Sequence, residues 1–170
     1  GYAALNYNTT GSCNTAIGYR AMLQNTTGCR NVAIGEYTSY ANSTGECNVG
    51  IGYRTLYANA TGCYNQGIGD NALTSNTTGC WNTAIGHSAM NSNVTGSNNV
   101  AIGRYSLFYA NSGSSNIAIG NSTLHRNCGG GSNVAIGICS LVCNTYGNYN
   151  TAIGSSALCC NTTGEHNFAA

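Results

Sequence analysis

Hydrophobic residues recur along this chain at a fixed interval. An isoleucine preceded by Ala or Gly returns every 17 residues from Ile17 to Ile153, without insertion or deletion. A second apolar position, Leu or Met after Ala, Thr or Ser, keeps the same spacing, with Ser39 as its exception. The 170 residues therefore hold ten periods (170/17). Such strict self-similarity predicts a repeat architecture.

Two glycines and one asparagine complete each period. A leading glycine follows the isoleucine and a middle glycine stands ten positions later, as at Gly18 and Gly28. Because glycine suits positive φ and close backbone approach, these positions predict two turns with two short extended segments between them. In coils stacked about 4.8 Å apart, identical asparagines predict a hydrogen-bonded ladder. The ladder column is Asn14, Asn31, Asn48, Asn65, Asn82, Asn99, Asn116, Asn133, Asn150 and Asn167.

A unit of 17 residues is too short for a helical hairpin, so we expect an all-β fold, a parallel β-solenoid (β-roll) of ten 17-residue coils. Residues 1–170 form a single array, expected to be a window of a longer, uncapped solenoid. The isoleucine and the Leu/Met of each coil are expected to form a thin core. Alternate residues of the "VAI" segment point to opposite faces. One face would line the coil and the other would lie against a neighbouring chain.

Charged residues make up 5% of the chain, against roughly 25% in average proteins. The five arginines form no basic stripe for nucleic acid, and no apolar run approaches a membrane span. Glu36 and Asp70 share a column two coils apart, and no nucleophile or phosphate-binding motif is present. The histidines fall in three different columns and no C-x-x-C pair occurs. We therefore expect no enzyme activity, no cofactor and no metal site.

Ten cysteines favour an oxidising compartment, and hence an extracellular, cell-surface or virion-surface location. Residues 17 apart in stacked coils lie about 4.8 Å apart, which is within the usual Cα range of a disulfide. The pairs Cys63–Cys80 and Cys143–Cys160 satisfy this spacing.

Three further cysteines, Cys13, Cys29 and Cys47, occupy neighbouring columns of successive coils. Either Cys13–Cys29 or Cys29–Cys47 is compatible with that placement, and both alternatives stay open. No mate is evident for Cys128, Cys139 and Cys159, one of which could bond another chain.

Sequons of the form N-x-(S/T) predict N-linked glycans in a secreted protein. One column supplies Asn8, Asn25, Asn42, Asn59, Asn76, Asn93 and Asn161, and Asn121 lies in another. Glycans would keep so uncharged a surface soluble. The alternative is that Asn-x-Thr-Gly is turn chemistry alone, because Asn127 and Asn144 keep the asparagine without the threonine.

The pentapeptides "NTAIG" and "NVAIG" and the "AL" that follows them resemble the head repeats of YadA-like trimeric autotransporter adhesins. They are also similar to "NTTGxxNTAIGxxAL" repeats of phage and viral tail-fibre-like proteins. The resemblance covers all ten periods and implies a β-roll in which three chains pack together. It transfers no functional residue, because the shared residues are structural. The longer period, the cysteines and the sequons favour a eukaryotic or viral exterior.

These observations together predict a structural subunit of an extracellular glycosylated fibre or surface appendage, which self-associates end to end or side by side. The alternative is a trimeric adhesin or tail-fibre module that binds host surfaces, and aromatic residues such as Tyr64 and Trp81 are expected outside, where they could contact sugars. A third hypothesis, ice binding, rests on paired threonines such as Thr26 and Thr27. Adjacent threonines on a strand point to opposite faces, so a flat threonine array is missing.

Overall fold

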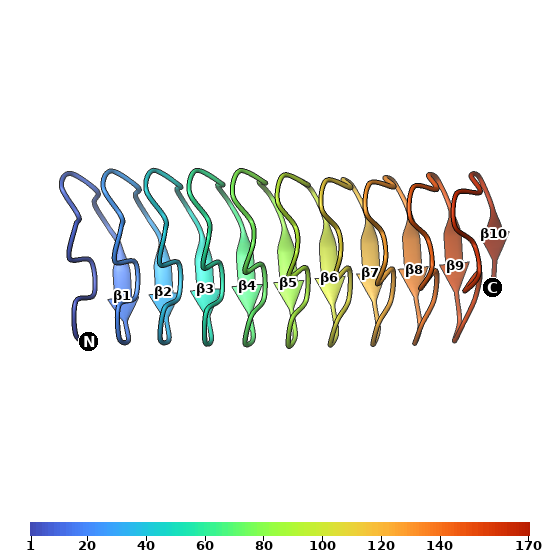
Figure 1. Cartoon of the computed structure of the whole chain (residues 1–170), viewed down its shortest axis with the longest axis horizontal. Helices are drawn as coiled ribbons and strands as arrows, with labels where there is room; N and C mark the ends of the chain where they lie inside the picture. The colour runs from blue at the N-terminus through green and yellow to red at the C-terminus, as the bar shows by residue number, and fades with distance from the viewer.

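The chain winds into a β-solenoid whose coils stack in a row from one terminus to the other (Figure 1). The computed structural model describes residues 1–170, and it confirms the all-β parallel solenoid expected from the 17-residue period. Each coil contributes one short strand to a single sheet. The strands are β1 (Thr15–Ile17), β2 (Val32–Ile34), β3 (Val49–Ile51), β4 (Gln66–Ile68), β5 (Thr83–Ile85), β6 (Val100–Ile102), β7 (Ile117–Ile119), β8 (Val134–Ile136), β9 (Thr151–Ile153) and β10 (Phe168–Ala169).

The ten strands pair in parallel and in chain order from β1 to β10. Their register follows the repeat: Ile17 pairs with Ile34, and Ile34 with Ile51. Each residue therefore lies beside its equivalent in the next coil, so every position of the repeat becomes a column along the solenoid. Where neighbouring repeats share an unusual residue, the stacking gathers these residues into a surface patch. Where one repeat lacks the usual residue, the column is interrupted.

The strand places its small residue inward and its isoleucine outward. Ala84 and Ala101 of β5 and β6 have no solvent exposure, whereas Ile85 and Ile102, the last residues of the same strands, are 36% and 37% exposed. The expectation that isoleucine fills the core was therefore wrong. The Cβ atoms of a strand alternate between its faces, and the coil is so thin that its inner face accepts only Ala or Gly.

The expectation of two extended segments per coil was also wrong. The half of the coil that carries the Leu/Met column contains no strand; its residues form turns with positive φ, such as 50° at Met90 and 49° at Leu107. Left-handed backbone is unfavourable for such side chains and persists only where surrounding structure enforces it. Here backbone bonds to the next coil enforce it: Met90 N–H donates to the Ser106 carbonyl at 2.9 Å, and Leu107 N–H to that of Thr123 at 2.9 Å.

The apolar core is a column of Leu and Met side chains facing the column of inward alanines. Leu73, Met90 and Leu107 are fully buried in a cluster that runs through most of the array. A smaller cluster around Met22 lies at the N-terminal end. The two are separate because the intervening coil carries Ser39 in the Leu/Met column.

The two glycine columns are required by close approach between coils. At the middle position, a Cβ on Gly45 would stand 2.5 Å from both Asn42 Oδ1 and the Gly62 carbonyl oxygen. At the leading position, Gly69 has φ of 120°, and a Cβ there would lie 2.8 Å from the Gly86 carbonyl. A side chain at either place would push neighbouring coils apart, which explains why both columns hold glycine alone.

Candidate functional surfaces

The outward face of the sheet is a flat apolar strip. The isoleucine column runs along its whole length, and the first strand residues beside it are mostly Val or Thr, as at Val32 and Thr83. The nine isoleucines of this column are between 36% and 57% exposed. Most of them are 36–38% exposed, so the chain covers the larger part of each side chain and leaves the rest facing outward. This isoleucine strip matches the segment that the sequence suggested would face a neighbouring chain.

Two columns of asparagine hold the turns together. In the column predicted as a ladder, Asn99 Nδ2 donates to the Gly113 carbonyl at 2.8 Å and to Asn82 Oδ1 at 3.2 Å. Its own Oδ1 accepts the backbone N–H of Asn116 at 2.9 Å. Since each amide bonds both the coil below and the coil above, this column acts as a continuous polar spine.

The second asparagine column contains the predicted glycan acceptors. Asn59 is fully buried, and its Nδ2 donates to Asn42 Oδ1 and to the Gly62 carbonyl, both at 2.9 Å. Asn76 Nδ2 then donates to Asn59 Oδ1 at 2.7 Å. A glycan is joined through Nδ2, the atom that these bonds occupy, so a glycan here would break the ladder and the turn. The folded coil thus favours the turn-chemistry alternative.

The remaining sequons differ in exposure. Asn25, Asn42, Asn76 and Asn93 are buried in the same way as Asn59. Asn8 and Asn161, in the outermost coils, are half-buried and take part in the same ladder. Asn121 lies in another column and is exposed, with its Oδ1 accepting a bond from Ser122. It is the predicted acceptor that the folded coil leaves accessible.

All ten cysteines are free thiols in the structure. Cys63 N–H donates to Cys80 Sγ at 3.2 Å, so these two residues stack in adjacent coils as their spacing predicts, and burial raises the pKa of the Cys63 thiol. Cys159 Sγ and Cys160 Sγ lie 3.5 Å apart. The disulfides Cys63–Cys80 and Cys143–Cys160, and the alternatives among Cys13, Cys29 and Cys47, stay predictions.

The structure contains no cluster of three or more His, Cys, Asp or Glu side chains with metal-ligand geometry. None of its segments forms a helix of the length and hydropathy that a membrane crossing requires. The threonines considered for ice binding do not form one array. Thr26 Oγ1 is engaged with the Ser43 carbonyl at 3.0 Å, while the adjacent Thr27 is exposed.

Tyrosines and arginines gather over the first four coils, on the turn segments that follow each leading glycine. Tyr2 stacks on Tyr19 with ring centroids 5.5 Å apart, and Tyr40 stacks on Tyr57 at 5.1 Å. Tyr37 lies between these pairs, 5.4 Å from Tyr19 and 5.7 Å from Tyr40. The rings therefore form a continuous chain along the solenoid axis.

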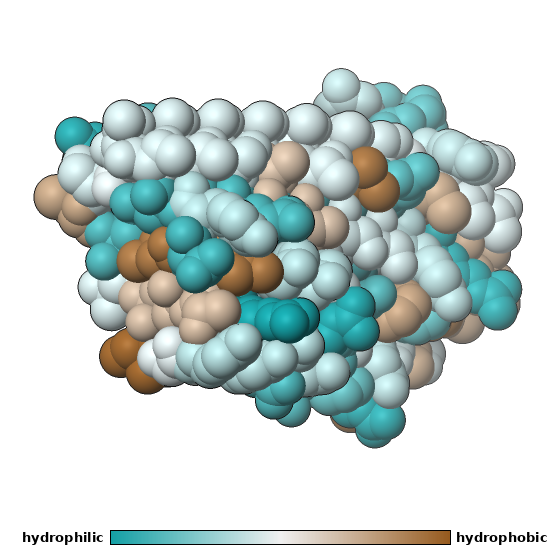
Figure 2. Space-filling model, turned by 60° about the vertical axis from the view of Figure 1, so that its left-hand side comes forward, coloured by the Kyte–Doolittle hydropathy of each residue, from teal (hydrophilic) through white to brown (hydrophobic).

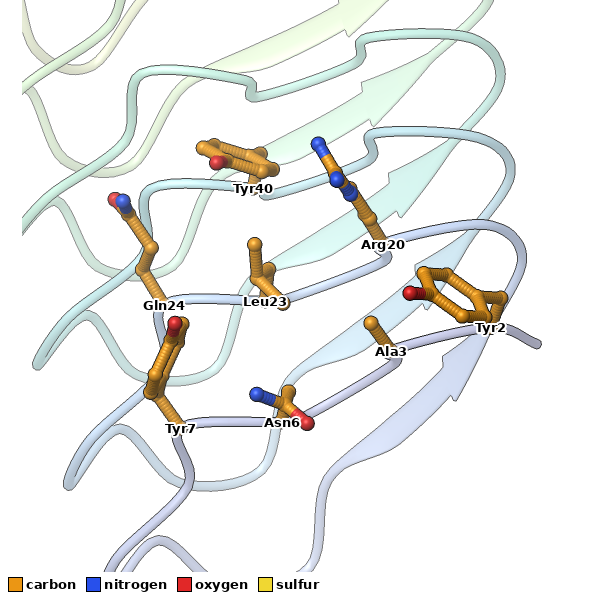
Figure 3. A pocket seen from close by; sticks show the side chains of 8 residues that line it. All are labelled: Tyr2, Ala3, Asn6, Tyr7, Arg20, Leu23, Gln24 and Tyr40. Carbon is orange, nitrogen blue, oxygen red and sulfur yellow. The ribbon is translucent and has the colours of Figure 1, made fainter.

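Two adjoining cavities open along this row of rings. The larger, of about 480 Å³, is lined by Tyr2, Ala3, Asn6, Tyr7, Arg20, Leu23, Gln24 and Tyr40 (Figure 3). The smaller, of about 250 Å³, is lined by Arg20, Tyr37, Tyr40, Tyr53, Arg54 and Tyr57. Because they share Arg20 and Tyr40, we treat them as one surface, the tyrosine–arginine groove. On the face drawn in Figure 2, which brings the N-terminal end forward, apolar residues are interspersed with hydrophilic ones.

A second aromatic group lies farther along, where the Phe108 and His125 rings stack 5.4 Å apart beside Tyr105 and Tyr109. Burial lowers the pKa of His125. On another edge, Tyr64 and Trp81 stack face to face at 4.0 Å, and both are exposed, as the sequence predicted. Neither group lines either of the two cavities of the tyrosine–arginine groove.

Comparisons with protein-family models, with curated proteins and with solved structures return no match for this chain.

Sequence reasoning missed the second asparagine ladder and the groove. The signal for the ladder was present, since nine of the ten coils carry Asn three residues before the middle glycine. The groove could have been found by reading columns across coils: Arg20, Tyr37 and Arg54 are spaced by 17 residues and therefore stack. The bends that bring Tyr40 and Tyr57 beside them could not be read from spacing.

Proposed function

We propose that the chain is a non-catalytic structural module of an extracellular fibre or surface appendage, assembled by side-by-side association of solenoids. The isoleucine strip is the observation that carries this proposal. A contiguous exposed apolar surface of this kind is typical of a protein–protein interface. A row of nine equivalent side chains on a flat sheet also suits a partner with the same 17-residue repeat, namely another copy of this chain.

The free energy of burying the isoleucines favours an interface in which the whole strip is buried together. Fully burying an isoleucine contributes about 1.5–3 kcal/mol. At the observed exposure, about 0.5–1 kcal/mol remains available at each position. One isoleucine could not offset the several kcal/mol that association costs, whereas a row of nine reaches that range. Side-by-side association should therefore depend on the length and continuity of the strip.

Kinship with autotransporter heads and tail-fibre repeats is part of the proposal, and it makes three chains around one axis the expected stoichiometry. End-to-end stacking of solenoids is a further mode in the proposal, because an open edge of a parallel sheet invites pairing. The extracellular location rests on the cysteine content.

Sedimentation velocity over a range of protein concentrations tests the assembly. We expect the chain to sediment as an oligomer, with a trimer supporting the proposed kinship. The double variant Ile85→Lys/Ile102→Lys places two charges on the strip without touching the core, and we expect it to sediment as a monomer. Thr78→Lys adds a charge at an exposed turn and should leave the oligomer intact. A monomeric parent chain at all concentrations would overturn the proposal.

The alternative function is a binding module of the adhesin or tail-fibre kind. The observation that favours it is the tyrosine–arginine groove, since binding sites are usually concave surfaces with a few convergent polar groups. A glycan array probed with the labelled chain tests this alternative. Selective binding that Ile85→Lys leaves unchanged would support it, and a uniformly negative array would count against it.

A further inference from the structure

The tyrosine–arginine groove holds two arginines, and the carboxylates nearest to it in the array are Glu36, in the coil between them, and Asp70, whose Oδ1 accepts the Tyr53 N–H at 3.1 Å. Arg54 stacks over Tyr57, with Cζ 4.5 Å from the ring centroid, and its buried Nε has no hydrogen-bond partner. Arg20 stacks over Tyr19, with Cζ 5.1 Å from the centroid. The electrostatic effect of the neighbouring tyrosines, largest for Tyr19 and smaller for Tyr37 and Tyr40, raises the pKa of Arg20. The guanidinium groups are thus held by aromatic rings, and the Arg54 Nε–H is left without an acceptor.

The spacing of the two arginines is set by the solenoid. They occupy the same column two coils apart, with Tyr37 in the coil between them. Two coil spacings put their backbones about 10 Å apart. The rigid column fixes this backbone spacing along the axis, and the guanidinium groups reach from it to Tyr19 and to Tyr57. Ten ångströms is close to the length of a disaccharide, so anions on every second sugar of an extended chain would match it.

The rest of the groove suits a sugar chain. Tyr2, Tyr7, Tyr40 and Tyr53 line it with hydroxyl groups that both donate and accept hydrogen bonds. Asn6 and Gln24 add side-chain amides to the same wall, and Leu23 supplies an apolar contact (Figure 3). The groove is open and runs along the axis, as an extended polymer requires. An arginine fork is the side chain best matched to a carboxylate or sulfate.

We propose that the tyrosine–arginine groove binds an acidic saccharide, a sugar chain with a carboxylate or a sulfate on alternate residues. This site deepens the binding alternative above and rests on it, and it is independent of side-by-side assembly through the isoleucine strip. Arg20 and Arg54 each take one anionic group, while the tyrosines contact the intervening sugar. Two sources of the anion share this chemistry, uronic acids and sulfated sugars.

Isothermal titration calorimetry with three probes tests the proposal. The probes are a hyaluronan hexasaccharide, which carries carboxylates only, a heparin hexasaccharide, which also carries sulfates, and a neutral maltohexaose. We expect at least one acidic probe to bind and maltohexaose not to bind. The stronger acidic probe identifies the anion. Absence of heat with both acidic probes, or equal affinity for maltohexaose, would overturn the proposal.

Matched variants distinguish specific binding in the groove from general attraction between opposite charges. Arg20→Gln and Arg54→Gln should each weaken binding about tenfold or more, while Arg30→Gln, an exposed arginine on another edge, should change it less than twofold. Arg20→Lys keeps the charge but loses the fork, and should also weaken binding. Equal losses for Arg20→Gln and Arg30→Gln would contradict the groove.

Two controls keep the outcomes distinct. Circular dichroism on each variant checks that the solenoid is folded. If Arg54→Gln does not fold, Arg20→Lys still tests the groove. Ile85→Lys/Ile102→Lys should bind the acidic probe with the affinity of the parent chain. Loss of binding in that variant would mean that the groove binds saccharide only in the assembled protein, and would overturn the proposal that binding is independent of assembly. Assembly without saccharide binding would overturn the groove and leave the structural function in place.

Discussion

The two asparagine columns of this solenoid look alike in sequence but differ in how they are bonded. In the spine column, each Oδ1 accepts a backbone N–H from the next coil, as Asn99 does from Asn116. In the second column, no Oδ1 accepts a backbone N–H, and where one is bonded its donor is a side-chain amide, as at Asn59, which accepts from Asn76. The spine column therefore supplies hydrogen-bond partners to backbone groups of two coils. The second column bonds the backbone only within its own turn.

The columns also differ in continuity. The spine runs through all ten coils, but the second column is interrupted at Ala110. Asn93, one coil before the gap, keeps its Nδ2 bonds to Asn76 and Gly96, yet its buried Oδ1 has no partner. Asn127, one coil after it, donates only to its own turn, at Gly130. A solenoid thus tolerates a break in a ladder of side chains, and no break occurs where the ladder holds backbone groups.

The largest effect is expected from removing one amide of the spine. Asn99→Ala would leave the Gly113 carbonyl and the Asn116 backbone N–H without partners inside the array. An unsatisfied buried polar group costs about 1–3 kcal/mol, so we expect a loss of about 4 kcal/mol in the free energy of unfolding. Urea titration followed by circular dichroism measures it. A loss below 1 kcal/mol would show that water replaces the amide and that the spine is not needed.

A smaller effect is expected in the second column. Asn59→Ala removes the hydrogen bonds to Asn42 and Gly62 and the acceptor of Asn76, but it leaves no backbone N–H without an acceptor. We expect a loss of about 2–3 kcal/mol in the same urea titration. The comparison with Asn99→Ala is the point of the experiment. If Asn59→Ala costs as much or more, the backbone bond is not what distinguishes the columns.

The contrast also explains what the sequence could predict. The 17-residue period indicates the stacking, the parallel register and the spine, because a constant column must face itself in the next coil. Period alone does not say which way a column points. Isoleucine was expected inside, and the structure places it outside, since only Ala or Gly fits on the inner face of the strand. For the Asn-x-Thr-Gly asparagines the sequence left glycans and turn chemistry open, and the structure buries most of them in their turns. The groove depends on positive-φ turns, for which non-glycine residues give no sequence signal.

The smallest effect, and the only gain, is expected from repairing the gap. Ala110→Asn would place an amide between Asn93 and Asn127, giving the unpaired Asn93 Oδ1 a donor and Asn127 Nδ2 an acceptor. We expect the free energy of unfolding to rise by about 1–2 kcal/mol, because the new bonds also remove an existing penalty. A rise in the urea midpoint with an unchanged slope would be the evidence.

A double-mutant cycle separates this repair from a general preference for Asn at that turn. In an Asn93→Ala background the unpaired Oδ1 is gone, so Ala110→Asn should gain about 1 kcal/mol less than it does in the parent chain. An equal gain in both backgrounds would mean that the new amide acts within its own turn. The coupling between the two coils measures directly how far a ladder of side chains, as opposed to one of backbone groups, ties one repeat to the next.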